Sequence, residues 1–139
     1  MSAEGASGAE FARAWLEHSP FVAHLGIRLV SMGEDEAVLE LPFSDALPTA
    51  GDVVHGGAIS SLIDTAAAAA AWSSHDPANG TKWGTVGMST SFLSAARATD
   101  LRATARVTRR GRSVVFCSIR VEDPAGTPIA DGLVSYRLG

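Results

Sequence analysis

The sequence contains only one cysteine, Cys117, so no disulfide can form within the chain. This excludes the small disulfide-stapled scaffolds of secreted proteins. The thiol lies inside an apolar, strand-like stretch, which favours a buried structural group over a nucleophile. An unpaired thiol suits a reducing compartment, and we therefore expect the protein to be cytoplasmic.

The sequence also lacks a hydrophobic stretch long enough to cross a bilayer. Its most apolar run, residues 58–72, has 15 residues and includes Asp64, whereas a membrane-spanning helix needs about 20 apolar residues. The N-terminal stretch carries acidic side chains where a secretory signal requires basic ones. We predict neither a membrane segment nor an export signal.

Basic side chains are scarce in the first part of the chain. Residues 1–81 contain 2 basic and 11 acidic side chains, whereas residues 82–139 contain 9 basic and 4 acidic ones. Six arginines lie between Arg97 and Arg112, opposed there only by Asp100. Because no aromatic residues alternate with them and no nucleic-acid reading motif accompanies them, we predict a phosphorylated small molecule as the partner, and not a nucleic acid.

The composition is that of a globular protein, with 46% hydrophobic and 19% charged residues in a chain of 139. This length is typical of one domain. There is no internal repeat, and the only low-complexity stretch is the alanine run at residues 66–71. We expect a single domain over residues 1–139, in which residues 1–20 form an N-terminal helical extension.

Alternation of apolar and polar residues predicts six strands. Residues 101–107, for example, place an apolar side chain at every second position, which gives one buried and one solvated face. Short turns such as Arg110-Gly111-Arg112 require antiparallel neighbours. The expected strands span residues 27–32, 36–43, 82–93, 99–109, 113–122 and 127–138, with a short helix over residues 11–17 and loops over residues 44–54 and 74–81.

Residues 55–73 are predicted to form one long helix. Apolar residues recur along it at helical spacing, which is the pattern of a core-facing stripe. Asp64 lies about 100° from the centre of this stripe and has small neighbours, so another backbone or a ligand can approach it. The stripe consists of Ile59, Leu62, Ile63, Ala66 and Ala70.

The order of the elements predicts an α+β protein. Two strands, a buried helix and four antiparallel strands are expected to pack as one sheet that covers one central helix. This is the hotdog arrangement, an antiparallel sheet wrapped around a long helix.

The start of the long helix carries the most specific motif. His55, Gly56 and Gly57 open the helix, and Asp64 follows two turns later. This pattern resembles the signature of PaaI-type hotdog-fold acyl-CoA thioesterases, and the similarity extends over residues 21–138. The resemblance implies a thioester hydrolase that converts an aromatic or short- to medium-chain acyl-CoA to the free acid and CoA. It implies no metal and no cofactor other than the coenzyme A of the substrate.

These residue types fit the chemistry of thioester hydrolysis. The reaction needs donors aimed at the developing oxyanion, and a carboxylate that activates water or attacks the carbonyl itself. A glycine-rich helix start exposes unpaired N–H groups at the positive end of the helix dipole. The resemblance assigns the main donor to Gly56, with His55 orienting the turn or the substrate carbonyl. Asp64 supplies the carboxylate.

The spacing of these residues predicts an oligomer. Eight residues separate Gly56 from Asp64, which is about 12 Å along one helix and too far for both to act on one thioester. Antiparallel helices in a two-fold dimer would bring Gly56 of one subunit to Asp64 of the other. The resemblance implies the same shared site. We expect a homodimer that assembles further as a dimer of dimers, a homotetramer.

Further site residues follow from the resemblance. Thr85, with Gly87 leaving space beside it, falls where the family has a hydroxyl that holds the water or the carboxylate. Thr49 stands six residues before His55, where relatives often have Asn, and is a second candidate for positioning water. The candidates for binding substrate are Gly57, Ser61, Arg97, Arg110 and Arg112, of which the arginines would contact the CoA phosphates.

Less specific interpretations stay open. His55 can be a structural residue that pins the helix start, and residues 109–112 can be a solvated hairpin tip. The three tryptophans are predicted to be core or rim packing, with a substrate box as the alternative, and His18, His24 and His75 to be surface residues. The alternative functions are a hydratase or dehydratase of the same fold and a noncatalytic acyl-CoA binding module.

Overall fold

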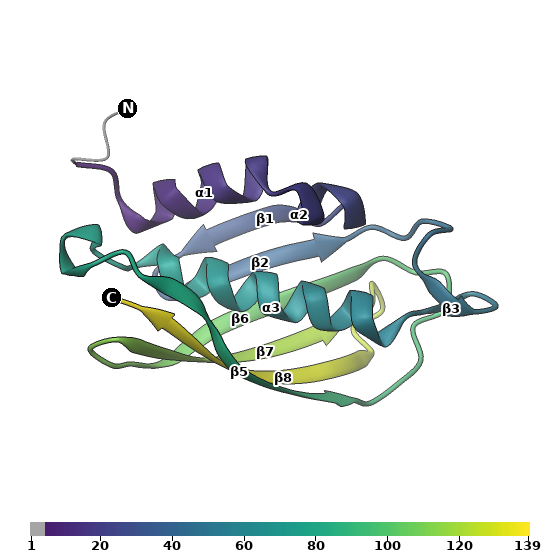
Figure 1. The fold of residues 1–139 in the computed structure, drawn as a ribbon. Coiled ribbons are helices and arrows are strands. Elements are labelled where there is room, and N and C mark those ends of the chain that lie inside the picture. The colour runs from purple at the N-terminus through teal and green to yellow at the C-terminus, as the bar shows by residue number, and fades with distance from the viewer. Residues whose placement is uncertain (1–4) are drawn as a thin grey trace.

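Six strands form one antiparallel sheet in the order β1-β2-β6-β7-β8-β5. The computed structural model describes residues 5–139, and Figure 1 shows the strands as a curved layer along one side of a long helix. The observed ends of these six strands lie within two residues of the predicted ends. The strands are β1 Arg28–Gly33, β2 Glu36–Leu41, β5 Trp83–Phe92, β6 Leu101–Arg110, β7 Val114–Glu122 and β8 Pro128–Leu138.

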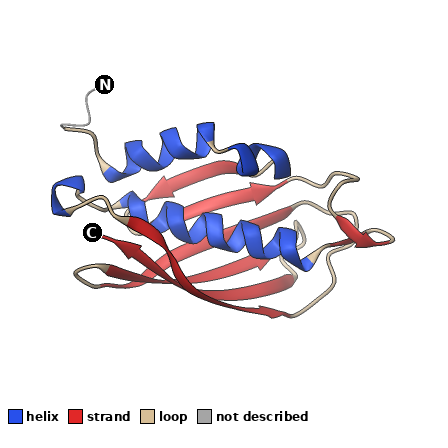
Figure 2. Ribbon diagram, in the orientation of Figure 1, coloured by secondary structure: helices blue, strands red, loops and turns tan. Residues whose placement is uncertain are grey.

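The long helix is α3, Gly56–Ser73, and it lies against the inner face of this sheet (Figure 2). Every residue of the predicted apolar stripe is at most 3% exposed, and the alanine run beside it is buried as well. The strands follow the predicted alternation, because Leu101 and Ala103 of β6 are buried whereas Arg102 between them is exposed. The α+β hotdog prediction is therefore confirmed.

Helix α3 crosses the sheet at Gly132 of β8. A Cβ atom at this position would lie 2.5 Å from Cγ2 of Ile63, a distance that packed atoms do not adopt. The two residues are both buried. Because Gly132 has no side chain, α3 can pack closely against β8 at Ile63, the residue that precedes Asp64.

Two helices precede the sheet, where one was predicted. Helix α1, Gly8–His18, begins at a capping box in which Ser7 and Glu10 each accept from the other's backbone N–H. It packs along α3 through a buried face (Figure 1). Helix α2, Pro20–Leu25, was not predicted, because a proline after a helix commonly ends it, whereas Pro20 occupies the first turn of a new helix. Residues 1–4 of the expected extension lie outside the described residues.

The segment over residues 44–54 contains two short strands where only a loop was predicted. Strand β3, Pro48–Ala50, pairs with β4, Val53–Val54, in a small separate ribbon. The backbone of this ribbon is also bonded to residues 96–98, since Val54 N–H donates to Ala96 O over 2.9 Å. These contacts fix the chain immediately before α3. They therefore help to position the predicted site residues His55 and Gly56 at the start of the helix.

Strand β5 lies at one edge of the sheet and is bonded only to β8. Several of its apolar side chains are exposed, among them Val86 at 63% and Phe92 at 55%. An edge strand with exposed apolar residues is a common place for pairing with another chain. Within residues 5–139 no helix has the length and apolar character that crossing a membrane would demand.

Candidate active site

His55 is the N-cap of α3. Its backbone is extended, with φ −60° and ψ 135°, and its Nδ1 accepts a 2.7 Å hydrogen bond from the Gly57 N–H. The His55 N–H donates in turn to Leu47 O over 2.8 Å, which anchors the cap to the preceding segment. A Cβ at position 57 would lie 2.9 Å from the same Nδ1, so a side chain there would displace the imidazole from its present position in the cap. His55 therefore has a structural role in fixing the helix start.

Gly56 occupies the first position of the helix, where backbone N–H groups have no partner within the helix. A Cβ here would lie 3.2 Å from Cζ of Phe92. The exposed ring of Phe92, at the end of β5, therefore lies against Gly56. The start of α3 therefore has no side chains at Gly56 and Gly57, and the ring of Phe92 borders it at Gly56. Phe92 was not predicted, because its contact with Gly56 depends on how β5 and α3 pack.

Asp64 lies in the middle of α3, half-buried, and is bonded to β5. The Thr85 hydroxyl donates a 2.6 Å hydrogen bond to Asp64 Oδ1. A β-bulge between Thr85 and Gly87 shifts the register of β5 against β8 at this point. The resemblance left open whether Thr85 holds the water or the carboxylate, and in the structure its hydroxyl contacts the carboxylate of Asp64, 21 positions away in the sequence.

Tyr136 lies on the same side of the sheet, paired with Thr85 across β8 and β5. Its hydroxyl accepts a 3.2 Å hydrogen bond from Trp72 Nε1. Burial raises the pKa of Tyr136 to about 12, the hydrogen bond from Trp72 opposes that rise, and the negative charge of Asp64 adds to it. Tyr136 was also missed from the sequence, where it was only one more inward position of a predicted strand.

The remaining candidates on the helix side are more dispersed. The Ser61 hydroxyl donates to Gly57 O over 2.8 Å, so it is bonded to the first turn of its own helix. Thr49 is exposed on β3, close in the chain to the cap. Gly56 and Asp64 stand on one helix as predicted, about 12 Å apart along its axis. A single chain therefore does not bring Gly56, the predicted oxyanion donor, and Asp64 to one point.

The three candidate arginines do not form one cluster. Arg97 pairs with Asp52 at 3.1 Å, beside the segment that leads into α3. Arg110 pairs with Asp35 at 2.7 Å, and the Asp35 N–H donates to Ser74 Oγ just after the other end of α3. Arg112 is exposed at the β6–β7 turn. Two of the three predicted phosphate ligands are thus already engaged with carboxylates.

One of the predicted surface histidines is buried. His75 is 9% exposed, its Nε2 lies 2.7 Å from Gly80 O, and its ring meets Trp72 edge-on. The prediction was wrong because α1 covers this turn, with Gly8 so close that a Cβ there would lie 2.4 Å from His75 O. His18 and His24 are exposed, as predicted. Cys117 is buried, as predicted for a structural thiol, and burial raises its pKa to about 11.

The fold is that of the hotdog class. The family model described as Thioesterase superfamily matches residues 51–130, which include Gly56, Asp64 and Thr85. The chain belongs to the thioesterase superfamily.

Similarity to individual proteins agrees with this assignment. A candidate esterase of Halobacterium salinarum is 32% identical, with 91% of this chain and 89% of that protein covered. The solved structure of the Escherichia coli PaaI protein, from the phenylacetic acid degradation operon, superposes with a TM-score of 0.82 at 24% identity and covers 95% of this chain and 94% of that one. A thioesterase family protein of Silicibacter pomeroyi gives a TM-score of 0.87 at 23% identity, over 96% and 100% of the two chains. These two structures have the same fold.

Proposed function

We propose that this protein is an acyl-CoA thioesterase, which hydrolyses an aromatic or short- to medium-chain acyl-CoA to the free acid and CoA. The observation that carries the proposal is the hydrogen bond from Thr85 to the carboxylate of Asp64, on a helix whose start presents Gly56. The bond leaves Oδ2 of Asp64 for a second partner. Family membership supports the hydrolase class, and the substrate is the finer part of the proposal.

The proposed chemistry has two routes with the same products. In one, Asp64 takes a proton from water while the water oxygen bonds to the thioester carbon. In the other, Asp64 itself attacks and the resulting anhydride is hydrolysed. In both, the Gly56 N–H stabilises the oxyanion, the carbon–sulfur bond breaks, and the CoA thiolate leaves and takes up a proton. Thr85 holds the carboxylate, and Thr49 is the further candidate for positioning water.

We place the site between two subunits. Gly56 and Asp64 of one chain are too far apart for one thioester, and β5 offers an unpaired edge with exposed apolar side chains. Pairing of β5 with its copy around a two-fold axis would set the two α3 helices side by side and antiparallel, which creates two equivalent sites. A dimer of dimers is the assembly we expect beyond this. Arg97, Arg110, Arg112, Gly57 and Ser61 remain the candidates for contacts with the CoA portion.

The direct test replaces the carboxylate. Asp64→Ala should lower kcat by a factor on the order of 10² or more, which is the usual scale for losing a general base. The protein should still fold, because alanine favours a helix. Asp45→Ala, which removes an exposed carboxylate in a loop, is the control. Release of free thiol from a panel of acyl-CoA esters gives the rates. Turnover by Asp64→Ala at the wild-type rate would refute the mechanism.

A second test addresses the shared site. Gly56→Val and Asp64→Ala should each be inactive alone, whereas a mixture that exchanges subunits should regain activity through heterodimers with one intact site. Light scattering should give a dimer or a larger even assembly. If subunit exchange is proven and no activity returns, the proposed sharing of Gly56 and Asp64 between subunits is refuted. If the wild type binds several CoA esters and cleaves none, the protein is a noncatalytic binding module.

A further inference from the structure

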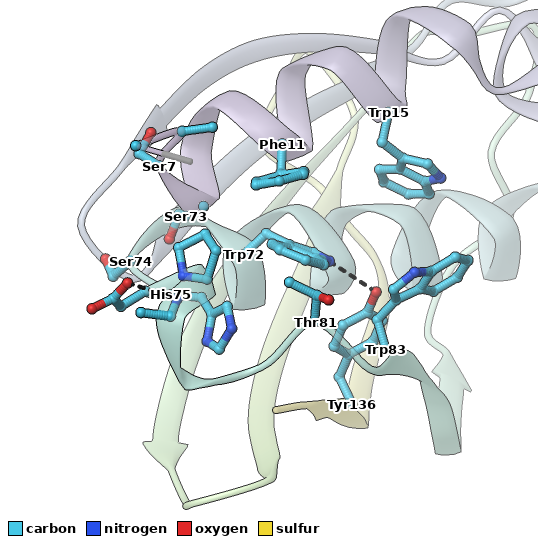
Figure 3. A pocket seen from close by; sticks show the side chains of 16 residues that line it. Ser7, Phe11, Trp15, Trp72, Ser73, Ser74, His75, Thr81, Trp83 and Tyr136 are labelled. Atoms are coloured by element: carbon cyan, nitrogen blue, oxygen red, sulfur yellow. Dashed lines mark hydrogen bonds between the residues drawn. The ribbon is translucent and has the colours of Figure 1, made fainter. Parts of the chain in front are cut away.

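All three tryptophans and the only tyrosine of the chain line a single cleft. Figure 3 shows Trp15 on α1, Trp72 on α3, Trp83 on β5 and Tyr136 on β8 around one hollow, together with Phe11. The volume of this hollow is about 1220 Å³. These residues come from four elements, of which α1 and β8 lie near opposite ends of the sequence. We refer to this hollow as the aromatic cleft.

Its walls are held by contacts among the aromatic rings. The rings of Phe11 and Trp72 lie 5.6 Å apart, and Trp72 is tied to Tyr136 by the 3.2 Å hydrogen bond. Gly8 fixes the start of α1 against Trp72, since a Cβ there would lie 2.1 Å from Trp72 O. In contrast, the indole of Trp83 is 62% exposed. The cleft therefore has a rigid wall and one broad aromatic surface that is free to contact a ligand.

The cleft adjoins the carboxylate site. Trp83 precedes Thr85 by two residues on β5, which is about 7 Å along a strand. Tyr136 is the cross-strand partner of Thr85. Asp64 is also close enough to Tyr136, a lining residue, for its negative charge to contribute to the raised pKa of that phenol. The cleft and the pair of Asp64 and Thr85 are therefore neighbours on the inner face of the sheet.

We propose that the aromatic cleft binds the acyl group of the substrate, and that it selects a bulky, ring-bearing apolar acyl group with α1 as a specificity element. This inference rests on the proposed function, because it uses Asp64 as the position of the thioester carbon. The described lining contains no Lys or Arg, and Asp76 at the rim is acidic, so the phosphates of CoA are disfavoured there. Aromatic walls favour edge-on and offset packing with a ring in the ligand. The volume exceeds what an acetyl group would fill.

The kinetic test compares two substrates. Trp83→Ala should lower kcat/KM for phenylacetyl-CoA about tenfold or more, as expected for lost pocket contacts, and the loss for acetyl-CoA should be several-fold smaller. The matched control is Phe21→Ala, which removes a 58% exposed ring on α2 outside the cleft and should change neither value. An equal loss for both substrates with Trp83→Ala, or a wild type that does not prefer phenylacetyl-CoA over acetyl-CoA, would overturn the inference.

A binding test needs no catalysis. Because every tryptophan lies at the cleft, intrinsic fluorescence reports on it directly. Phenylacetate at millimolar concentration should change the emission of the Asp64→Ala protein, acetate should not, and Trp83→Ala should weaken the effect. No response to phenylacetate, or the same response to acetate, would overturn the inference. If phenylacetate binds in this way and the wild type cleaves no CoA ester, the cleft is a binding site for a ring-bearing group but the proposed thioesterase function is refuted. If the wild type cleaves CoA esters and phenylacetate gives no response, the proposed function is supported and the role of the cleft is refuted.

Discussion

The hydroxyl of Thr85 donates a 2.6 Å hydrogen bond to Oδ1 of Asp64. Bonds of this length between a hydroxyl and a carboxylate are charge-assisted and orient the acceptor. We expect Thr85→Val, which keeps the shape and removes the donor, to lower kcat about tenfold with little change in KM. Thr85→Ser should restore most of the rate, because it restores the donor. Steady-state kinetics of the three proteins provides the measurement.

The same strand supplies the control for this prediction. Thr90 also faces α3, but its hydroxyl is buried without a partner among the described residues. Thr90→Val should therefore leave kcat unchanged and leave thermal stability unchanged or slightly higher. Equal losses of rate in Thr85→Val and Thr90→Val would mean that both act through packing of β5.

The proposed contacts between arginines and the CoA phosphates predict different KM effects for substrates with and without the nucleotide. If Arg112 contacts the CoA phosphates, Arg112→Ala should raise KM several-fold for an acyl-CoA and much less for a pantetheine thioester that lacks the nucleotide. Arg110→Ala should in addition lower stability, by up to about 1 kcal/mol, because it leaves Asp35 without its partner. Arg120→Ala, which breaks an exposed pair with Asp131 elsewhere on the sheet, is the control. Equal changes in KM for the two substrates would show that the arginines of this turn do not contact the CoA phosphates and that the turn is only a solvated hairpin tip.

The close packing of α3 on β8 predicts that substitutions of Gly132 and Ile63 have non-additive effects on stability. Gly132→Ala should destabilise the protein by about 1–3 kcal/mol, because the new Cβ would overlap Cγ2 of Ile63. In an Ile63→Ala background the same Cβ would stand 3.6 Å from the Cβ of residue 63, an ordinary contact. The cost of Gly132→Ala should then nearly vanish. Urea unfolding of the four proteins measures this coupling, and strict additivity would contradict the crossing geometry.

Cys117 predicts a loss of stability at alkaline pH. Burial raises its pKa from 9.0 to about 11, so between these values the unfolded chain loses a proton that the folded protein retains. Ionisation then favours the unfolded state, and the free energy of unfolding should fall as pH rises through this window. Cys117→Ala should reduce that slope by up to about 1.4 kcal/mol per pH unit. A smaller slope should persist, because the pKa of Tyr136 is raised from 10.0 to about 12. Identical slopes in the two proteins would contradict the assignment.

Much of the fold could be predicted from periodicity, because α3 and the six strands of the large sheet are each longer than the errors at their ends. The apolar stripe of α3 and the alternation in β6 depend on positions close in sequence, and both are seen in the structure. Helix α2 was missed because Pro20 can either end or start a helix. The burial of His75 was missed because it depends on α1 packing over a distant turn.

In the candidate site, too, some residues could be predicted from the sequence and others could not. The residues of the helix start and Asp64 could be found from a local motif, and Thr85 from the resemblance. The ring of Phe92 against Gly56 and the gathering of the tryptophans could not, since each requires contacts between segments that no short pattern relates. Residues of this kind are visible only once the strands have been placed beside the helix.

The cap at the start of α3 limits what the imidazole of His55 can do. An acceptor for the Gly57 N–H must be an unprotonated nitrogen, so the proton of the neutral ring lies on Nε2. In this tautomer the ring offers a donor to its surroundings and has no free basic nitrogen. Removing a proton from a substrate would require Nδ1, and the helix would lose its cap in the process. His55 is therefore not available as the loop histidine base that a hydratase of this fold would use, which fits the proposed role of Asp64 as the carboxylate of a thioesterase.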